Sequence, residues 1–125
     1  MAEGQHPVLI VDDDLAVRES LKFALEAEGH SVHAFVGGVD LLAYPSLSQA
    51  RCLVLDYHMP EMDGLEVVAQ LKARNCAVPV ILITGRATSA LRHQAAIVGV
   101  RHVVEKPLMD SALFESIKEV LSPKA

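Results

Sequence analysis

The chain is poor in cysteine, in aromatic residues and in long apolar runs, and it carries no excess of positive charge. Its 125 residues include two cysteines, two tyrosines, three phenylalanines and no tryptophan. Two cysteines without a C-x-x-C spacing argue against a disulfide scaffold and favour a reducing compartment. No apolar run approaches the roughly 20 residues of a membrane-spanning helix. The formal net charge of −5 argues against direct binding of nucleic acid through its phosphates.

Aliphatic residues dominate what is present. Hydrophobic residues make up 51% of the chain and aromatic residues only 4%, so the core should consist of Val, Leu, Ile and Ala. The length fits one domain and is too short for two. We expect this domain to cover residues 8–121, with an N-terminal extension over 1–7 and a tail or the start of a linker over 122–125. The extension lacks the basic start and apolar core of a signal peptide, so we expect a cytoplasmic protein.

Short aliphatic runs alternate with segments of helical periodicity along the chain. The expected strands lie within residues 7–14, 31–35, 51–56, 78–84 and 102–107. The expected helices lie within residues 15–28, 37–44, 63–74, 88–98 and 110–121. Strands that alternate with helices on short loops imply right-handed βαβ units. The pattern therefore predicts an α/β fold, a doubly wound parallel sheet with helices on both faces.

Capping residues mark where several of these helices begin. Asp14 and Asp110 precede the first and last helices, and Asp63 with Glu66 has the spacing of a capping box. Three breakers mark helix ends, namely Gly29, Pro45 and Gly99.

Polar residues lie where four of the five expected strands end. These strand-end residues are Asp12, Asp13, Asp56, Thr84 and Lys106. Each of them alone is typical of a solvated turn or an ordinary polar strand end. In open parallel sheets, however, sites form outside the carboxyl ends of the strands. Because four strand ends contribute polar residues to one edge, we interpret them together as a site.

The charges of this set indicate its chemistry. Three clustered carboxylates repel one another and favour a bound cation, and Mg²⁺ or Mn²⁺ with oxygen ligands suits them. An aspartate can act as a nucleophile and form an aspartyl phosphate. Phosphoryl transfer needs positioning and stabilisation of the phosphoryl oxygens, which the metal ion, the Lys106 ammonium and the Thr84 hydroxyl can provide.

Four motifs resemble the receiver domain of two-component response regulators, in particular receivers that precede helix-turn-helix output domains. The motifs are "LIVDDD", "LVLDYHMPEMDGLE", "VILITG" and "VEKP", and the resemblance covers residues 8–121. It implies a flavodoxin-like (βα)₅ fold with strand order 2-1-3-4-5. It also implies a phosphorylation-controlled signalling switch that is no enzyme for a separate substrate and catalyses only its own phosphorylation and dephosphorylation.

The resemblance assigns roles to the acidic residues. Asp56 is the expected phospho-acceptor, which receives a phosphoryl group from the phosphohistidine of a sensor histidine kinase or phosphotransfer domain. Asp13, Asp56 and the backbone carbonyl of His58 are the expected Mg²⁺ ligands, with Asp12 bound through a water. Pro60 and Gly64 are expected to shape the turn that follows Asp56.

The resemblance also assigns roles at the next two strand ends. Lys106 is expected to pair with the phosphoryl oxygens, and its peptide bond to Pro107 is expected to be cis. Thr84 is expected to hydrogen-bond the phosphoryl group and to report its arrival. The side chains of His58 and Arg86 lie at the rim, where they can tune the lifetime of the acyl phosphate in either direction.

One position departs from the family. Receivers usually carry Tyr or Phe three residues before the lysine, and this chain has Val103. Valine has no ring that can follow the movement of Thr84, and His102 is a poor substitute because adjacent strand residues face opposite sides. Two interpretations stay open. Either the face formed by the helix at 88–98, the strand at 102–107 and the last helix shifts through Thr84 and its loop, or another surface transmits the signal.

Partners follow from the same resemblance. Besides the kinase, we expect an output domain or a downstream protein, and a homodimer through the face just defined remains a hypothesis. Membrane contact is not expected. One alternative function is a phosphorylation-independent interaction module with a receiver fold, for which Val103 leaves room. A less favoured alternative is a phosphatase of haloacid-dehalogenase type, which needs a second acid where this chain has His58.

Overall fold

Five parallel strands form the central sheet in the order β2-β1-β3-β4-β5. The computed structural model describes residues 6–106 and 112–122. The strands are β1 Val8–Val11, β2 Val32–Phe35, β3 Cys52–Asp56, β4 Val80–Thr84 and β5 His102–Glu105. Both the fold class and the strand order predicted from the sequence are confirmed.

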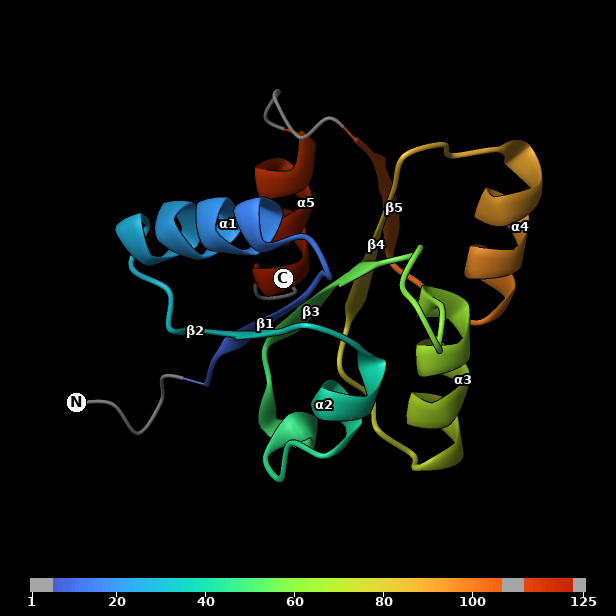
Figure 1. The fold of residues 1–125 in the computed structure, drawn as a ribbon, viewed down its shortest axis with the longest axis horizontal. Helices are drawn as coiled ribbons and strands as arrows, with labels where there is room; N and C mark the ends of the chain where they lie inside the picture. The colour runs from blue at the N-terminus through green and yellow to red at the C-terminus, as the bar shows by residue number, and fades with distance from the viewer. Residues whose placement is uncertain (1–5, 107–111, 123–125) are drawn as a thin grey trace.

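Helices cover both faces of this sheet (Figure 1). The helices are α1 Leu15–Ala27, α2 Gly38–Leu42, α3 Gly64–Ala73, α4 Ser89–Ile97 and α5 Ala112–Leu121. On one face pack α1 and α5, and on the other pack α2, α3 and α4. A short 3₁₀ helix, η2 Leu47–Gln49, was not predicted. The expected cap Asp110 and the expected cis peptide at Pro107 lie outside the described residues.

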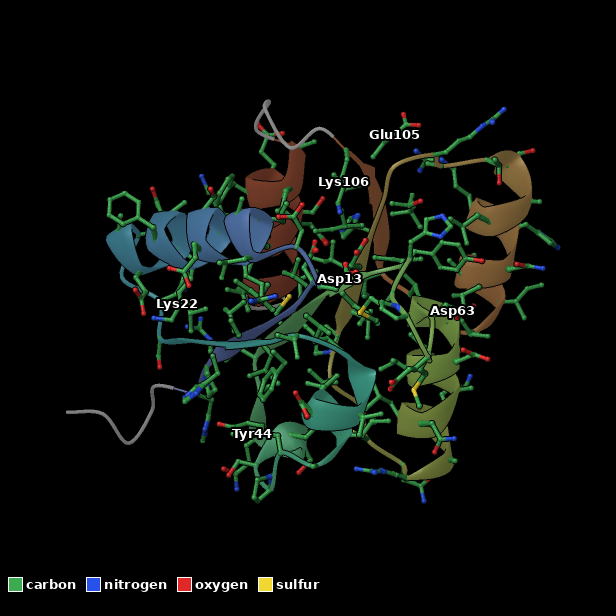
Figure 2. The ribbon with its side chains drawn as sticks, in the orientation of Figure 1. Asp13, Lys22, Tyr44, Asp63, Glu105 and Lys106 are labelled. Atoms are coloured by element: carbon green, nitrogen blue, oxygen red, sulfur yellow. The ribbon has the colours of Figure 1, made fainter. Side chains whose placement is uncertain are left out.

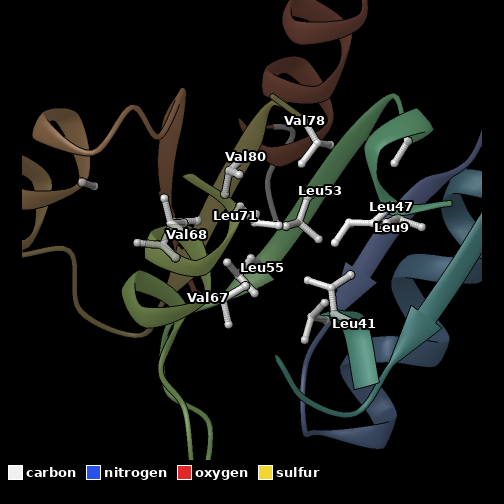
Figure 3. Close-up of a cluster of buried hydrophobic side chains, with 14 of the residues drawn as sticks. Leu9, Leu41, Leu47, Leu53, Leu55, Val67, Val68, Leu71, Val78 and Val80 are labelled. Carbon is white, nitrogen blue, oxygen red and sulfur yellow. The ribbon is translucent and has the colours of Figure 1, made fainter. Parts of the chain in front are cut away.

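The strands are buried on both faces because their alternate side chains enter two separate aliphatic clusters. In β1, Leu9 and Val11 point to the cluster beneath α2, α3 and α4, whereas Val8 and Ile10 point to the cluster beneath α1 and α5. Figure 3 shows the first of these clusters. Continuous apolar runs are therefore required in the central strands, which explains why the sequence shows no alternation there.

Side-chain caps mark where α1 and α3 begin. Asp14 accepts hydrogen bonds from the backbone N–H groups of Ala16 and Val17, at 2.9 and 3.3 Å. The predicted capping box is present, with Asp63 and Glu66 each bonded to the other's backbone N–H. Because these caps fix where the helices begin, the residues between each strand and the next helix form a loop at one edge of the sheet.

Gly64 is a point of very close packing between α3 and the strand end that carries Asp56. A Cβ atom at this position would lie 2.7 Å from Leu82 Cδ1 and 2.9 Å from the carbonyl oxygen of Asp56. The backbone N–H of Gly64 donates to the Tyr57 carbonyl at 2.9 Å. Glycine at this position lets the chain return directly beneath the strand end.

Replacing Gly64 by alanine tests this close approach. Gly64→Ala should lower the free energy of unfolding by about 1–3 kcal/mol, because overpacking forces backbone to shift. Urea unfolding with an unchanged m-value measures the loss. Gly85→Ala is the matched control, because nothing lies within 4 Å of a Cβ there. Equal stability of the two variants would contradict the steric argument.

Candidate functional site

Three carboxylates meet at the carboxyl edge of the sheet. One carboxylate oxygen from each of Asp12, Asp13 and Asp56 lies within 4.8 Å of the other two. The strand register explains this meeting, because Val11 pairs with Leu55 and the next residues are Asp12 and Asp56. Asp12 is 1% exposed and Asp56 is 3% exposed, whereas Asp13 is open to solvent. The strand-end acids predicted from the sequence are thus brought together.

Asp12 is held in place from two sides. Its Oδ1 accepts the backbone N–H of Asp14 at 2.9 Å, and its backbone carbonyl accepts from Arg18 Nη1 at 2.8 Å. Its Oδ2 is buried and has no hydrogen-bond partner among the described residues, although Lys106 Nζ lies 3.3 Å away as an ion-pair partner. A buried carboxylate oxygen that has an ion pair but no hydrogen bond can still accept a further ligand or water molecule.

Lys106 brings the positive charge into the cluster. Its Nζ lies 3.3 Å from Asp12 Oδ2 and 3.4 Å from Asp56 Oδ1, and Figure 2 shows it at the same edge as Asp13. Burial lowers the pKa of Lys106, but the charges of Asp56 and Asp12 outweigh burial and raise it above its ordinary value. One ammonium therefore faces three carboxylates, and the cluster keeps an excess of negative charge.

The surroundings of Asp56 increase its proton affinity. Burial and the neighbouring charge of Asp12 raise the pKa of Asp56 from 3.8 to about 6, against the opposing effect of Lys106. The ionised side chain is thus poorly stabilised by the protein alone. A proton or a cation binding near it lowers this cost.

The carboxylate set fits a hard divalent cation. Its donors are oxygens from three carboxylates, which are suitable ligands for Mg²⁺ and Mn²⁺, and Asp12 Oδ2, which accepts no hydrogen bond from the described residues, is among them. The expected contribution of the His58 carbonyl stays a prediction. A metal ion here would also offset the repulsion that raises the pKa of Asp56.

Thr84 ends β4 fully buried, with 0% exposure. Its hydroxyl accepts from the backbone N–H of Arg86 at 3.2 Å and lies 3.3 Å from the Arg86 carbonyl, to which it donates. The register pairs Thr84 with Glu105 of β5. The hydroxyl is therefore engaged with the loop that follows it in this conformation.

The rim position and the tuning roles of His58 and Arg86 stay predictions. The side chains of His58 and Arg86 are exposed, and the His58 ring lies 4.7 Å from the Tyr57 ring. The turn between His58 and α3 includes Glu61 in a left-handed conformation and a hydrogen bond from the Met62 N–H to the Pro60 carbonyl at 2.8 Å.

Val103 and His102 face opposite sides of the sheet. Half-buried Val103 packs against the cluster beneath α2, α3 and α4, whereas His102 Nε2 lies 2.8 Å from Glu119 Oε1 on α5. His102 is thus turned away from the position of the usual aromatic ring, in agreement with the expectation.

Three contacts around the site were missed from the sequence. Arg18 binds the Asp12 carbonyl, Glu105 accepts the backbone N–H of Ala87, and Arg92 donates to the Val103 carbonyl. Each joins a side chain to a backbone group that no motif or periodicity marks. Their partners are known only once the loops are placed.

Asp56→Asn should stabilise the metal-free protein. At pH 7–8 we expect the free energy of unfolding to rise by about 1–2 kcal/mol, because a shift of one pKa unit corresponds to about 1.4 kcal/mol and screening by solvent reduces the full effect. The gain should shrink as the pH falls from about 6 towards 3.8, where the folded protein binds the proton more tightly than the unfolded chain.

Urea unfolding in EDTA at several pH values measures this effect. Asp40→Asn, at an exposed acid in the first turn of α2, controls for the loss of one charge. A variant that is less stable than the unmodified protein at pH 8 would show that the cluster tolerates the ionised Asp56. Adding Mg²⁺ should stabilise the unmodified protein more than Asp56→Asn, because the variant offers the metal ion one carboxylate fewer.

Comparison with known proteins places this geometry in a family. Residues 8–118 match the family described as "Response regulator receiver domain". The transcriptional regulatory protein FixJ of Azorhizobium caulinodans is 35% identical over 119 residues, which are 95% of this chain and 56% of that protein. Response regulator MprA of Mycobacterium leprae is 36% identical over 91% of this chain and 50% of that protein.

Solved structures agree with these relatives. The crystal structure of FixJ-N superimposes with a TM-score of 0.82 at 32% identity and covers 93% of both chains. No helix in residues 6–106 and 112–122 is long and apolar enough to span a membrane. The chain spans about half the length of the curated relatives that it matches. With its strand order, its acidic cluster and this match over residues 8–118, the chain belongs to the response regulator receiver domain family.

Proposed function

We propose that Asp56 accepts a phosphoryl group and that this modification switches the domain between two signalling states. One observation carries the proposal. Asp56 lies buried at the end of β3, with Oδ1 3.4 Å from Lys106 Nζ and with Asp12 and Asp13 close enough to share a cation with it. A nucleophilic carboxylate, a fixed ammonium and a cation site within one cluster suit phosphoryl transfer better than any other reaction.

The proposed donor is the phosphohistidine of a sensor histidine kinase or phosphotransfer domain. An Asp56 carboxylate oxygen forms a bond to phosphorus while the phosphorus–nitrogen bond breaks, and the bonding electron pair stays on the imidazole nitrogen. Lys106 is positioned to contact a phosphoryl oxygen because its Nζ already lies between Asp12 and Asp56. The divalent ion, when bound, neutralises charge on the transferred group.

Each acid of the cluster has its own task in this scheme. Asp13 is open to solvent and would ligate the metal together with Asp56, and buried Asp12 would reach it through a water from its unsatisfied Oδ2. Arg18 and the Asp14 N–H hold Asp12 in the required orientation. The bond from the Asp14 N–H to Oδ1 and the ion pair of Oδ2 with Lys106 favour an orientation in which Oδ2 is directed at the cluster.

Thr84 is the proposed sensor of the phosphoryl group. Its hydroxyl now bonds the backbone of Arg86, so contact with a phosphoryl oxygen requires that these bonds break. The loop from Gly85 to Thr88 moves with the hydroxyl, because Arg86 belongs to it. The modification thereby changes the surface at the start of α4 that a partner or output domain contacts.

Further parts of the proposal concern the surroundings of the domain. We place it in the cytoplasm, with residues 8–121 as the receiver and residues 122–125 as the tail or start of a linker. A homodimer through α4, β5 and α5 is compatible with the exposed Ile97 on α4. The domain acts on its own phosphoryl group and on no separate substrate.

A phosphorylation-independent interaction module is the second candidate. The aliphatic packing of Val103 favours it, because the usual aromatic reporter is missing. The complete acidic cluster and the Lys106 contacts favour the switch, since a passive module has no need for a buried excess of carboxylates.

Incubation with acetyl phosphate and Mg²⁺ tests the proposed function. Intact mass should increase by one phosphoryl group in the unmodified protein and in the control Asp40→Asn, and should not increase in Asp56→Asn. Lys106→Ala should slow uptake by about tenfold or more, because losing about 1.4 kcal/mol of transition-state stabilisation has that effect. No uptake by the unmodified protein at any Mg²⁺ concentration would favour the passive module.

A further inference from the structure

Strand β5 is tied to the segment after β4 by two polar contacts. Glu105 Oε2 accepts the backbone N–H of Ala87 at 3.1 Å. One turn into α4, Arg92 Nη1 donates to the Val103 carbonyl at 3.3 Å. As the last strand in the order, β5 has one edge without a strand neighbour, so its outer backbone groups are available to such side chains.

The first contact holds the loop that engages Thr84. Ala87 follows Arg86 directly, and both hydrogen bonds of the Thr84 hydroxyl end on the Arg86 backbone. Fixing the Ala87 N–H therefore keeps Arg86 where it satisfies the hydroxyl. In Figure 2, Glu105 lies at the end of β5 near the loop that leads into α4.

The rigid part of this arrangement is the strand pair itself. Thr84 pairs with Glu105 in the register, and the Lys106 N–H donates to the Thr84 carbonyl at 2.7 Å. The backbone of Glu105 is thus fixed relative to Thr84. The part that can move relative to both is the loop after β4, which contains Arg86 and Ala87. A carboxylate is a strong acceptor for a backbone N–H. Glu105 is exposed, however, so solvent weakens the hydrogen bond, which then moderately favours the bonded position of the loop.

We propose that Glu105 is a positioning residue for Thr84, holding the loop after β4 through the Ala87 N–H so that the Thr84 hydroxyl stays bonded to Arg86 and away from a phosphoryl group. The inference rests on the proposed function, in which Thr84 must turn towards that group. Breaking the Glu105 contact is then part of the switch. The contact joins β5 to the loop, so a movement of the loop affects β5 through this hydrogen bond. Val103 provides no aromatic ring for that coupling.

Beryllofluoride, a stable mimic of the phosphoryl group, tests the proposal on the full chain with Mg²⁺. Glu105→Ala should bind it about three- to tenfold more tightly, because the loss of one hydrogen bond makes the bound arrangement of Thr84 easier to reach. Glu105→Gln keeps an acceptor oxygen without the charge and should stay close to the unmodified protein. Glu28→Ala, at an exposed acid beyond α1, controls for the loss of one charge.

The glutamine variant separates the contact from simple charge. Equal tightening in Glu105→Gln and Glu105→Ala would mean that the negative charge near Lys106 repels the anion, and it would overturn the proposal. Unchanged affinity in Glu105→Ala would overturn it as well. Both variants should keep the fold, since the Glu105 side chain is exposed.

Amide hydrogen exchange gives a readout that does not depend on phosphoryl chemistry. Without metal or beryllofluoride, the Ala87 amide should exchange several times faster in Glu105→Ala than in the unmodified protein, whereas the Leu91 amide, capped by Thr88, should change little. Equal exchange at Ala87 would refute the Glu105 contact even in a protein that binds beryllofluoride. Failure of every protein to bind beryllofluoride, with faster exchange at Ala87, would refute the proposed function and leave the contact established.

Discussion

The ion pairs of Lys106 with two buried carboxylates are the interaction on which the rest of this structure depends. Asp12 follows β1 and Asp56 ends β3, so the two lie side by side because β1 pairs with β3, and both are almost fully buried. Two like charges in that position repel, and burial removes the water that would screen them. The Lys106 ammonium, within 3.4 Å of each carboxylate, reduces this repulsion but does not neutralise both charges. The remaining negative charge is what makes the cluster receptive to a cation.

The fold maintains this unfavourable cluster by making its surroundings rigid. The aliphatic clusters on both faces of the sheet fix the strand register, and helix caps at Asp14 and Asp63 fix where the loops end. Gly64 lets α3 begin directly beneath the Asp56 carbonyl. Stability gained in the core thus holds a site whose charges oppose folding, a common arrangement at functional sites.

The edge of the sheet has the opposite character. Around β5 the polar contacts with the loop and α4 include single hydrogen bonds from exposed side chains, Glu105 and Arg92. Such contacts can break at low cost, so movement started at Thr84 is expected to spread there more easily than through β1 or β3. The aliphatic Val103 packs against the core and leaves the polar contacts to link β5 with the loop.

Much of this molecule follows from local pattern in the sequence, because apolar runs, capping residues and strand-end acids act over a few neighbours. The alternating elements, the capping box at Asp63 and the meeting of Asp12, Asp13, Asp56 and Lys106 were predicted from those signals, and the strand order from the family resemblance. The short helix η2 and the contacts of Arg18, Glu105 and Arg92 were not. Each of these three contacts joins a side chain to a backbone group of another segment or loop. Only the tertiary structure decides them, because a backbone N–H or carbonyl is the same at every residue and its partner depends on where the loops come to lie.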